Sequence, residues 1–399
     1  MTARISTAGM HSAAIAQMLA QQAKLSVTQS QVASGKRVQS PADDPIAATQ
    51  ILDIQRARAQ NEQFGKNSVA ATNRLQTAES ALTDVGNVLQ RVRELAIQAN
   101  NATNDDLSLK SIATELRARL QELQDGANRR DASGDFIFSG FSAQTTPFAR
   151  TASGVAYYGD QGVRQLQIGP DQKVPDSFSG YQVFMDIPEG NGTFTTAAGV
   201  HTGTGTIDSG RVTNPAAWVP GNYTVRFNTP PDTWDVLDAT NAVVASGAYQ
   251  DGSAISFNGV QVTVTGTPAA GDTFTVAPAG KESIFKTLDD LISSLTAGGN
   301  TPSSRSQLNT NIANSLTQID QGLNHVLDLR SEVGARLSMI DAASDSRDGL
   351  DVELQQSLSD LQDLDYAEAI SRMNQQMVGL QAAQQAYTRI GQLSLFSYL

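Results

Sequence analysis

The sequence predicts a mainly α-helical protein that carries an all-β insert between two helical arms. Residues 1 to about 130 and about 281 to 399 are rich in Ala, Gln, Leu and Arg with little Gly or Pro, which favours long helices. Between them, short alternating runs of β-branched and aromatic residues are separated by Gly, Pro, Asn and Asp, which is typical of strands and turns. We therefore expect both chain ends to form a long antiparallel coiled coil or helical bundle.

This pattern divides the chain into five segments. The expected segments are a terminal assembly helix (1–42), a helical bundle with a β-hairpin (43–175), a β-rich inserted domain (176–280), the returning bundle (281–358) and a second terminal assembly helix (359–399). The hairpin is expected from "FIFSGF" and "VAYYGDQGVRQLQIG", which alternate apolar and polar residues around turn signals.

Hydrophobic repeats at alternating steps of three and four residues support the bundle. In the first arm the repeat comprises Leu75, Ala78, Leu82, Val85, Leu89, Val92, Ala96 and Ala99. In the second arm it comprises Ile312, Leu316, Ile319, Leu323, Val326, Val333, Leu337 and Ile340, with Arg330 at one skipped position. A third helix is expected from Leu109, Ile112, Leu116, Leu120, Leu123 and Ala127. We interpret "SDSRDGLDVELQ" at 344–355 as a connecting turn or a polar helix start, since it lacks the acidic ligands of a calcium loop.

The stretch "VASGKRVQSPADDPIAATQIL" at 32–52 indicates a hinge between two helices. Gly35 suits the position just after a helix, where a positive φ is needed. Asp44 suits the N-cap of the next helix, and Pro45 suits its first turn. A phosphate loop is rejected because only one glycine is present and Arg37 stands where a hydroxyl is required. Metal binding by Asp43 and Asp44 would need further ligands from elsewhere.

The outermost segments carry weaker apolar stripes than the bundle. One contains Ile15, Met18, Leu25 and Val32, with Gln22 and Gln29 between them; the other contains Ile370, Met373, Met377, Leu380 and Tyr387, broken by Gln384. Such polar stripes stabilise an isolated helix pair poorly. We therefore expect these nine apolar residues to form an assembly interface that orders when many copies pack together. An ordinary but weak coiled coil is the alternative.

Several separated motifs resemble the bacterial flagellin family. They are "ASGKRVQSPADDPIAA" at 33–48, "RSEVGARLSMID" at 330–341, "DLDYAEAISRMN" at 363–374 and the ending "LSLFSYL". "RIST" at 4–7, Pro45 and "GDFIFSGF" at 134–141 are similar to the members that join the flagellar hook to the filament. The resemblance covers both helical arms but not the β insert.

This resemblance implies an extracellular structural subunit, a ring-forming junction between hook and filament. The implied partners are hook-associated protein 1, flagellin, other copies of this chain, and an export chaperone that holds about 360–399. The resemblance also implies export by flagellar type III secretion, which would account for a start that lacks the features of a cleaved signal peptide. A flagellin, the filament subunit itself, is the nearest alternative.

Composition and motifs argue against other classes of function. The net charge is −12 and no Lys/Arg stripe occurs, so nucleic acid is an unexpected partner. No apolar run reaches the roughly 20 residues that span a bilayer. No catalytic, cofactor or metal motif stands out, and His11, His201 and His325 lie far apart. A carbohydrate-active insert is a more distant alternative, with its candidate acids at Asp232, Asp235 and Asp238.

Overall fold

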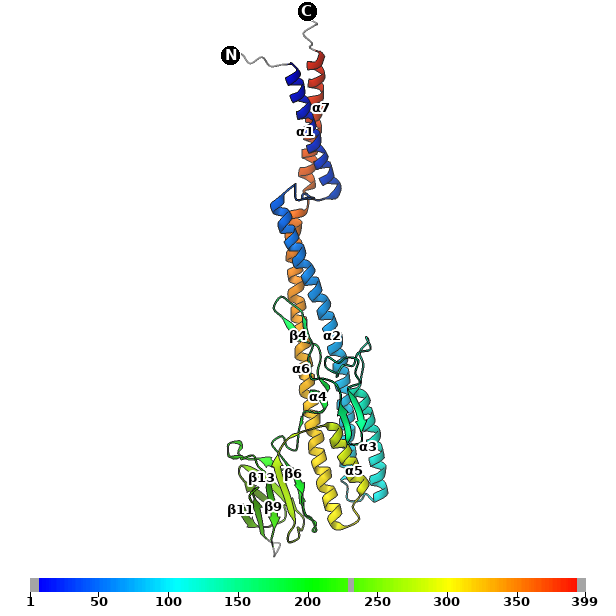
Figure 1. Ribbon diagram of the computed structural model, residues 1–399, viewed down its shortest axis with the longest axis vertical. Helices are drawn as coiled ribbons and strands as arrows, with labels where there is room; N and C mark the ends of the chain where they lie inside the picture. Colours follow the sequence, from blue (N-terminus) through cyan, green and yellow to red (C-terminus); the bar gives the residue numbers. More distant parts are fainter. Residues whose placement is uncertain (1–6, 229–232, 393–399) are drawn as a thin grey trace, which may run out of the picture. The chain divides into compact units, whose positions relative to one another are not determined.

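Helices form both ends of the chain and strands fill its middle, which confirms the predicted fold class (Figure 1). The structure is a computed structural model that describes residues 7–228 and 233–392. These residues fall into two units, one within the ranges 1–66 and 343–399 and the other within 67–342. Two long helices, α2 (Pro45–Ala99) and α6 (Pro302–Gln362), contribute to both units.

The first unit pairs the two ends of the chain. Helix α1 (Thr7–Ser34) lies antiparallel to α7 (Tyr366–Gln392), with the rings of His11 and Tyr387 in contact at 5.4 Å between centroids. The start of α2 lies against the end of α6, where Asn61 donates a hydrogen bond of 3.0 Å to the carbonyl of Arg347.

The second unit contains the helical bundle, in which α3 (Asp106–Ala127) and α5 (Ile284–Ala297) join α2 and α6. Every residue of the repeat predicted between Leu75 and Ala99 is buried, and so is every one predicted for α3. The repeat in α6 differs from the prediction at every second position. Leu316, Leu323 and Leu337 are only half-buried, whereas Ser315, Gly322 and Arg336, each one residue earlier, are buried. At the skipped position Leu329 is likewise buried, and Arg330 forms an ion pair with Glu79 at 2.7 Å.

The interpretation of 344–355 as a turn or helix start is wrong. This segment lies inside α6, which continues to Gln362. Its serines and aspartates are spaced among good helix formers, and the aliphatic neighbours that pair α6 with α2 override their preference for turns. Gly349 does not have the positive φ for which a turn would require glycine.

A β-hairpin lies on the bundle, although it does not include the first segment predicted for it. Strands β1 (Phe148–Thr151) and β2 (Gly154–Tyr157) form this hairpin, and β3 (Gln165–Gln167) pairs with β4 (Lys173–Pro175). The segment 136–140 instead forms a buried irregular loop, in which Phe138 packs edge-on against Phe184 of α4 (Gly180–Phe184) at 5.3 Å. Burial of five consecutive residues excludes the one-sided alternation of a surface strand.

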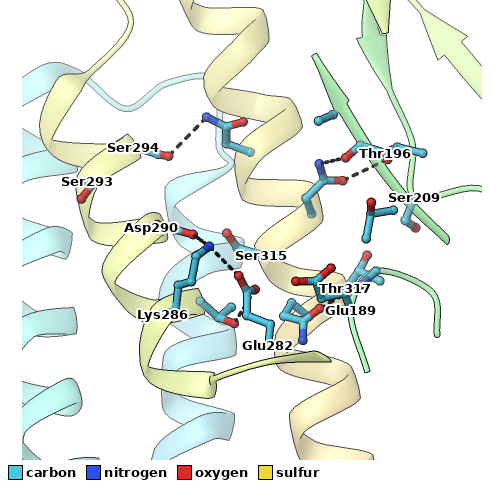
Figure 2. Close-up of a pocket in the computed structure, with 17 residues that line it drawn as sticks. Glu189, Thr196, Ser209, Glu282, Lys286, Asp290, Ser293, Ser294, Ser315 and Thr317 are labelled. Carbon is cyan, nitrogen blue, oxygen red and sulfur yellow. Dashed lines mark hydrogen bonds and ion pairs between the residues drawn. The ribbon is translucent and has the colours of Figure 1, made fainter. Parts of the chain in front are cut away.

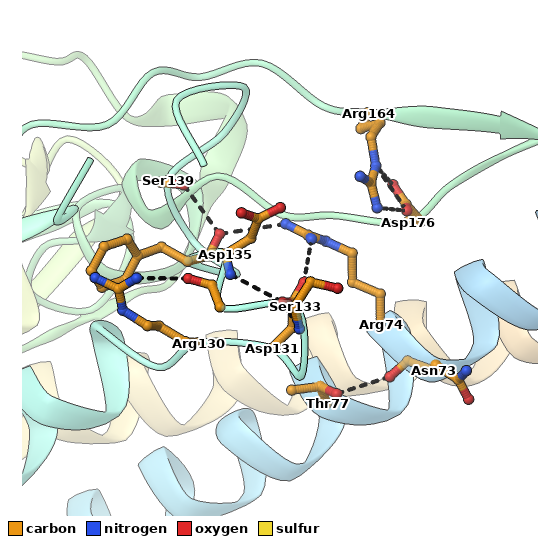
Figure 3. A network of polar contacts seen from close by, with 12 residues as sticks. Asn73, Arg74, Thr77, Arg130, Asp131, Ser133, Asp135, Ser139, Arg164 and Asp176 are labelled. Atoms are coloured by element: carbon orange, nitrogen blue, oxygen red, sulfur yellow. Dashed lines mark hydrogen bonds and ion pairs between the residues drawn. The ribbon is translucent and has the colours of Figure 1, made fainter. Parts of the chain in front are cut away.

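A buried ion pair ties this loop region to α2 (Figure 3). Arg74 Nη1 lies 2.7 Å from Asp131 Oδ2, and both side chains are largely buried. The other carboxylate oxygen of Asp131 accepts hydrogen bonds from the backbone N–H groups of Ser133 and Asp135. Arg74 thus fixes the turn from which the buried loop begins.

The insert is connected to the bundle by a short strand pair, β5 (Ile187–Pro188) with β15 (Lys281–Glu282). Its larger sheet has the strand order β11–β10–β9–β14–β6. Those strands are β6 (Phe194–Ala198), β9 (Tyr223–Phe227), β10 (Thr233–Leu237), β11 (Val243–Ala248) and β14 (Thr273–Pro278). The second sheet has the order β12–β13–β7, and β8 also pairs with β13. Its strands are β7 (Thr206–Ile207), β8 (Arg211–Val212), β12 (Ala254–Phe257) and β13 (Val260–Thr265).

One apolar core fills the space between the two sheets of the insert. It contains Phe194, Val225, Phe227, Val262 and Phe274, all at most 1% exposed, and Trp218 and Trp234 pack against its edge. Alternating inward residues from both sheets form this core, as in other β-sandwiches.

Candidate assembly surface and hinge

The hinge in the first unit is built from the stretch between α1 and α2. Gly35 has φ of +72°, and a side chain at this position would come within 2.8 Å of the Tyr366 hydroxyl. Its carbonyl accepts a hydrogen bond from the N–H of Leu364, and the N–H of Arg37 donates to the carbonyl of Gln362. The connections of both helical arms therefore cross at the same point.

Two aspartates organise the start of α2. Asp44 accepts a hydrogen bond from the N–H of Ala47 at 3.0 Å and forms an ion pair with Arg37. Both interactions lower the pKa of the Asp44 carboxyl group, and the hydrogen bond from Ala47 has the larger effect. Pro45 is the first residue of α2. Asp43 accepts hydrogen bonds from the N–H groups of Ser40 and Gln39, which lower its pKa as well. Both carboxylates thus stabilise the local turn.

A small apolar cluster packs the hinge against α6. Val38, Ala47 and Ile51 are buried, with Leu358 and Leu361 packed against them. Since α2 starts beside α6 and α6 ends beside the hinge, this cluster fixes the angle at which the chain leaves α1.

Every second position of the seam between α1 and α7 lies one residue earlier than predicted. The side chains that face inward in α1 are His11, Ala14, Met18, Gln21, Leu25, Thr28 and Val32. Those of α7 are Ala369, Met373, Gln376, Leu380, Ala383 and Tyr387. The prediction placed Gln22, Gln29 and Gln384 at inner positions, but all three are exposed. Both phases share Met18, Leu25 and Val32, so the apolar residues of α1 alone did not decide between them.

The nine predicted interface residues therefore divide into two sets. Met18, Leu25, Val32, Met373, Leu380 and Tyr387 contribute to the half-buried seam, whereas Ile15, Ile370 and Met377 lie on the exposed surface. Three further apolar residues of the same helices are exposed and were not predicted: Leu19 at 61%, Val27 at 48% and Val378 at 66%. These three residues do not belong to the predicted repeats of α1 and α7. In the sequence, only their apolar character within polar helices could have marked them as candidate interface residues.

The inner seam holds polar groups that lack partners. The amide oxygens of Gln21 and Gln376 are buried and have no hydrogen-bond partner among the described residues. Gln21 lies ten residues after His11, and Gln376 lies eleven before Tyr387, so antiparallel pairing places them at a similar level. Gln21 packs against Gly379, where an added side chain would lie 3.5 Å from its amide nitrogen. The helix pair α1 and α7 thus exposes apolar residues and buries amide groups without hydrogen-bond partners. A stable two-helix hairpin has the opposite arrangement.

A polar cleft of about 550 Å³ lies in the second unit, between the insert and the helices α5 and α6 (Figure 2). Lys286 lies between Glu282 and Asp290, at 2.5 and 2.6 Å. Burial lowers the pKa of Lys286, but hydrogen bonds to Asp290 and Glu282 outweigh it and raise this pKa above its usual range. Since the ammonium group is neutralised on both sides, the cleft offers no free cation for an anionic ligand.

Polar side chains of α6 bind the backbone of the insert beside this cleft. Asn314 donates a hydrogen bond of 2.6 Å to the carbonyl of Thr196, and Gln318 accepts one of 2.9 Å from the N–H of Gly190. Nearer the start of the helix, Ser306 donates a hydrogen bond to the carbonyl of Gly205 at 2.7 Å. The cleft lining therefore fixes the insert on α6, and its hydroxyl and amide groups have a structural use.

The acids proposed for a carbohydrate-active insert are engaged in local structure. Asp235 pairs with Arg226 and accepts a hydrogen bond from Asn228, while Asp238 accepts the N–H of Thr240. Asp232 lies outside the described residues. The described part of the chain also contains no cluster of three His, Asp or Glu side chains that could hold a metal ion.

The fold defines a class of structural protein in which the two chain ends pair with each other. Its features are the paired terminal helices, the hinge next to them and the intervening β domain. The comparisons with known proteins agree. The bacterial flagellin N-terminal helical region matches residues 5–143, and the flagellin C-terminal helical region matches 316–399. Residues 199–278 match the D2-like domain of flagellar hook-associated protein 1.

Individual relatives carry the same assignment. Flagellar hook-associated protein 3 of Escherichia coli K12 is 26% identical over 92% of this chain and 90% of that protein. Its namesake in Salmonella typhimurium is 32% identical over 46% of this chain and 57% of the relative. The crystal structure of the flagellar junction protein FlgL from Legionella pneumophila is 34% identical, covering 79% of this chain and all of that chain, with a TM-score of 0.72.

The chain belongs to the flagellin family, and within it is similar to flagellar hook-associated protein 3. Two of the motifs that carried the family resemblance lie wholly or partly outside the described residues, namely "LSLFSYL" at 393–399 and residues 4–6 of "RIST". Within the described ranges, no helix combines the length and apolar character needed to cross a membrane.

Proposed function

We propose that this chain is a non-enzymatic structural subunit of the bacterial flagellum that joins the hook to the flagellin filament. The observation that carries the proposal is the similarity to proteins named hook-associated protein 3, over 92% of the chain, and flagellar junction protein, over 79% of it. The paired chain ends supply a physical means of assembly, because they hold apolar residues at the surface.

In this proposal, copies of the chain form a ring that contacts hook-associated protein 1 on one side and flagellin on the other. The terminal helices bind neighbouring copies through Ile15, Ile370 and Met377 together with Leu19, Val27 and Val378, and the inner set of predicted residues holds α1 to α7. Flagellar type III export, with a chaperone on about 360–399, would deliver the chain to the outside.

Assembly on isolated hooks tests the proposed position in the flagellum. We expect the purified chain to add a short layer to hooks that carry hook-associated protein 1, and flagellin to extend filaments only from hooks that carry this layer. Electron microscopy of hooks with and without the chain measures both steps. Long filaments formed by the chain alone would instead identify a flagellin and contradict the proposal.

We further propose that α1 and α7 order fully only on assembly, because the buried amide oxygens of Gln21 and Gln376 keep the isolated pair marginal. Replacing both glutamines by leucine should slow amide hydrogen exchange in α1 and α7 of the free chain roughly tenfold or more, since each unsatisfied buried group costs about 1–3 kcal/mol. The wild-type helices should exchange faster than the buried part of α3.

Gln17→Leu with Gln385→Leu is the matched control, because both side chains are exposed. These substitutions add the same apolar groups without removing a buried amide. Equal protection in the wild type and the Gln21/Gln376 variant would show that the amide layer does not limit the pair, and the ordering mechanism would be lost while the proposed junction role would not.

A further inference from the structure

One face of α6 carries a row of polar side chains that lies against the insert. The row comprises Ser303, Ser306, Thr310, Asn314 and Gln318, which follow one another at steps of three and four residues and so share one side of the helix. Ser306, Thr310 and Gln318 are at most 5% exposed. We call these residues the contact row. Helix α6 therefore buries a polar row in addition to the seam by which it joins the bundle.

The contact row binds the insert, residues 189–280, mainly through backbone groups. Asn314 donates a hydrogen bond to the carbonyl of Thr196, and Ser303 donates one of 3.0 Å to the carbonyl of His201. The Thr196 hydroxyl, which donates to Asn314 at 3.3 Å, is the one side-chain partner in the described part of the insert. In the same part of the chain, no ion pair joins the insert to α5 or α6.

The apolar core of the insert is separate from the bundle. Every member of that core, and every partly buried apolar residue packed against it, lies between Phe194 and Val276. The polar cleft of about 550 Å³ opens between the insert and the helices α5 and α6 (Figure 2). Separation of the insert from α6 would thus uncover hydroxyl, amide and backbone groups, which water can satisfy at a small net cost, and would leave the insert core intact. Polar interfaces between domains commonly permit relative motion.

Two short connections tie the insert to the rest of the second unit. One is β5 followed by Glu189 and Gly190, the other is Gly280 followed by β15, and each strand is two residues long. Gly190 has φ of +56° and Gly192 has φ of +86°. Hinges absorb large φ/ψ changes at a few positions, often small residues, so these glycines are where the insert can turn. The N–H of Gly190 also donates to Gln318, so a turn there breaks a hydrogen bond of the contact row.

We propose that the insert is a hinged arm, which detaches from the contact row as a folded body and turns about β5, β15 and the glycines beside them. The detached state is a minor state of the free chain, because its polar groups exchange their hydrogen bonds for bonds to water. In a junction subunit, the arm would let the insert take different positions beside different neighbours while the bundle stays in place. The motion itself needs neither the terminal helices nor a second copy, so it is independent of the proposed function.

The absence of cysteine allows detachment to be measured by thiol labelling of the full chain. Three variants each carry one buried cysteine: Thr310→Cys in the contact row, Val262→Cys in the insert core and Ala113→Cys in α3. All three positions are at most 1% exposed, so a thiol reagent reaches each of them only when the surrounding structure opens. The Thr310 hydroxyl has no hydrogen-bond partner among the described residues, so its replacement removes no bond.

We expect Thr310→Cys to react at least about tenfold faster than both Val262→Cys and Ala113→Cys, because detachment exposes the contact row while the insert and the bundle stay folded. A smaller lead over Val262→Cys would mean that the insert must unfold to uncover α6. A smaller lead over Ala113→Cys would mean that the bundle must open. Either result would overturn the hinged-arm proposal. Circular dichroism of the three variants should match that of the unmodified chain.

A second set of variants separates detachment from local opening of α6. In the Thr310→Cys chain, Asn314→Ala with Gln318→Ala removes bonds made only in the docked state and should speed labelling at least about tenfold. Gln307→Ala with Asn311→Ala is the matched control, because it removes the same side chains from an exposed face of the same helix. This control should leave the rate unchanged.

An unchanged labelling rate in the Asn314/Gln318 variant would show that the contact row does not hold the insert. So would an equal gain in the Gln307/Asn311 control. Both results would overturn the hinged arm, and neither would affect the proposed junction function, which assembly on isolated hooks tests separately.

Discussion

Leu19→Asp together with Val378→Asp should abolish addition of this chain to hook ends while leaving the monomer folded. Both side chains are more than half exposed in the free chain, so the new carboxylates remain hydrated there. If neighbouring copies bury these positions, as we propose, each assembled contact would hold an unpaired negative charge. An uncompensated buried charge costs about 3–5 kcal/mol, and 1.4 kcal/mol is a factor of ten in affinity.

We therefore expect at least about 100-fold weaker addition, measured as the protein concentration at which half of the isolated hooks acquire a layer. Gln17→Asp is the matched control. It adds the same charge to α1 at an exposed position two residues earlier, about 200° away around the helix from Leu19. Circular dichroism of all three proteins should agree. Normal addition by the double variant would show that the outer face of α1 and α7 is not an assembly surface.

The bundle could be predicted from sequence because its repeats are strongly apolar and long. Where Leu, Val and Ala fill a seam from Leu75 to Ala99, only one phase of the helix buries them, and the structure has that phase. The fold class follows from such segments, since helices at both ends and strands in the middle leave few alternatives.

The terminal helices could not be predicted to the same depth. Helix α1 is rich in Ala and Gln, and the phase through Gln22 and the phase through Gln21 share Met18, Leu25 and Val32. Contact with α7 selects between them, and that contact joins residues more than 300 positions apart in the sequence. The exposed residues Leu19, Val27 and Val378 were missed because a seam search assigns apolar residues to the inside.

Sheet order in the insert also lay beyond local patterns. Strand β14 is the last of its sheet in the sequence but lies between β6 and β9, so that Val276 is paired with both Thr196 and Tyr223. Alternating residues predict strands, whereas long-range pairing determines their order. The buried loop at 136–140 was missed for a related reason: the structure buries both of its faces, and an alternating pattern assumes one.

Arg74→Met should destabilise the second unit by about 3 kcal/mol, because it leaves Asp131 without its cation in a largely buried place. Methionine keeps the length of the side chain and its apolar stem, so lost packing contributes little. Asp131 would retain the hydrogen bonds from Ser133 and Asp135, which prevents a larger loss. The measurement is the free energy of exchange of the most protected amides in α3, which ends just before this loop.

Two further variants separate the ion pair from other effects. Arg56→Met removes an arginine paired with Asp53 on the surface, where both side chains are more than 70% exposed, and should change stability by less than about 0.5 kcal/mol. Asp131→Asn combined with Arg74→Met removes both charges and should recover much of the loss, since no buried charge remains unpaired. If the double variant were as unstable as the sum of the single ones, the loss would come from packing around the loop, and the ion pair would not be what holds it to α2.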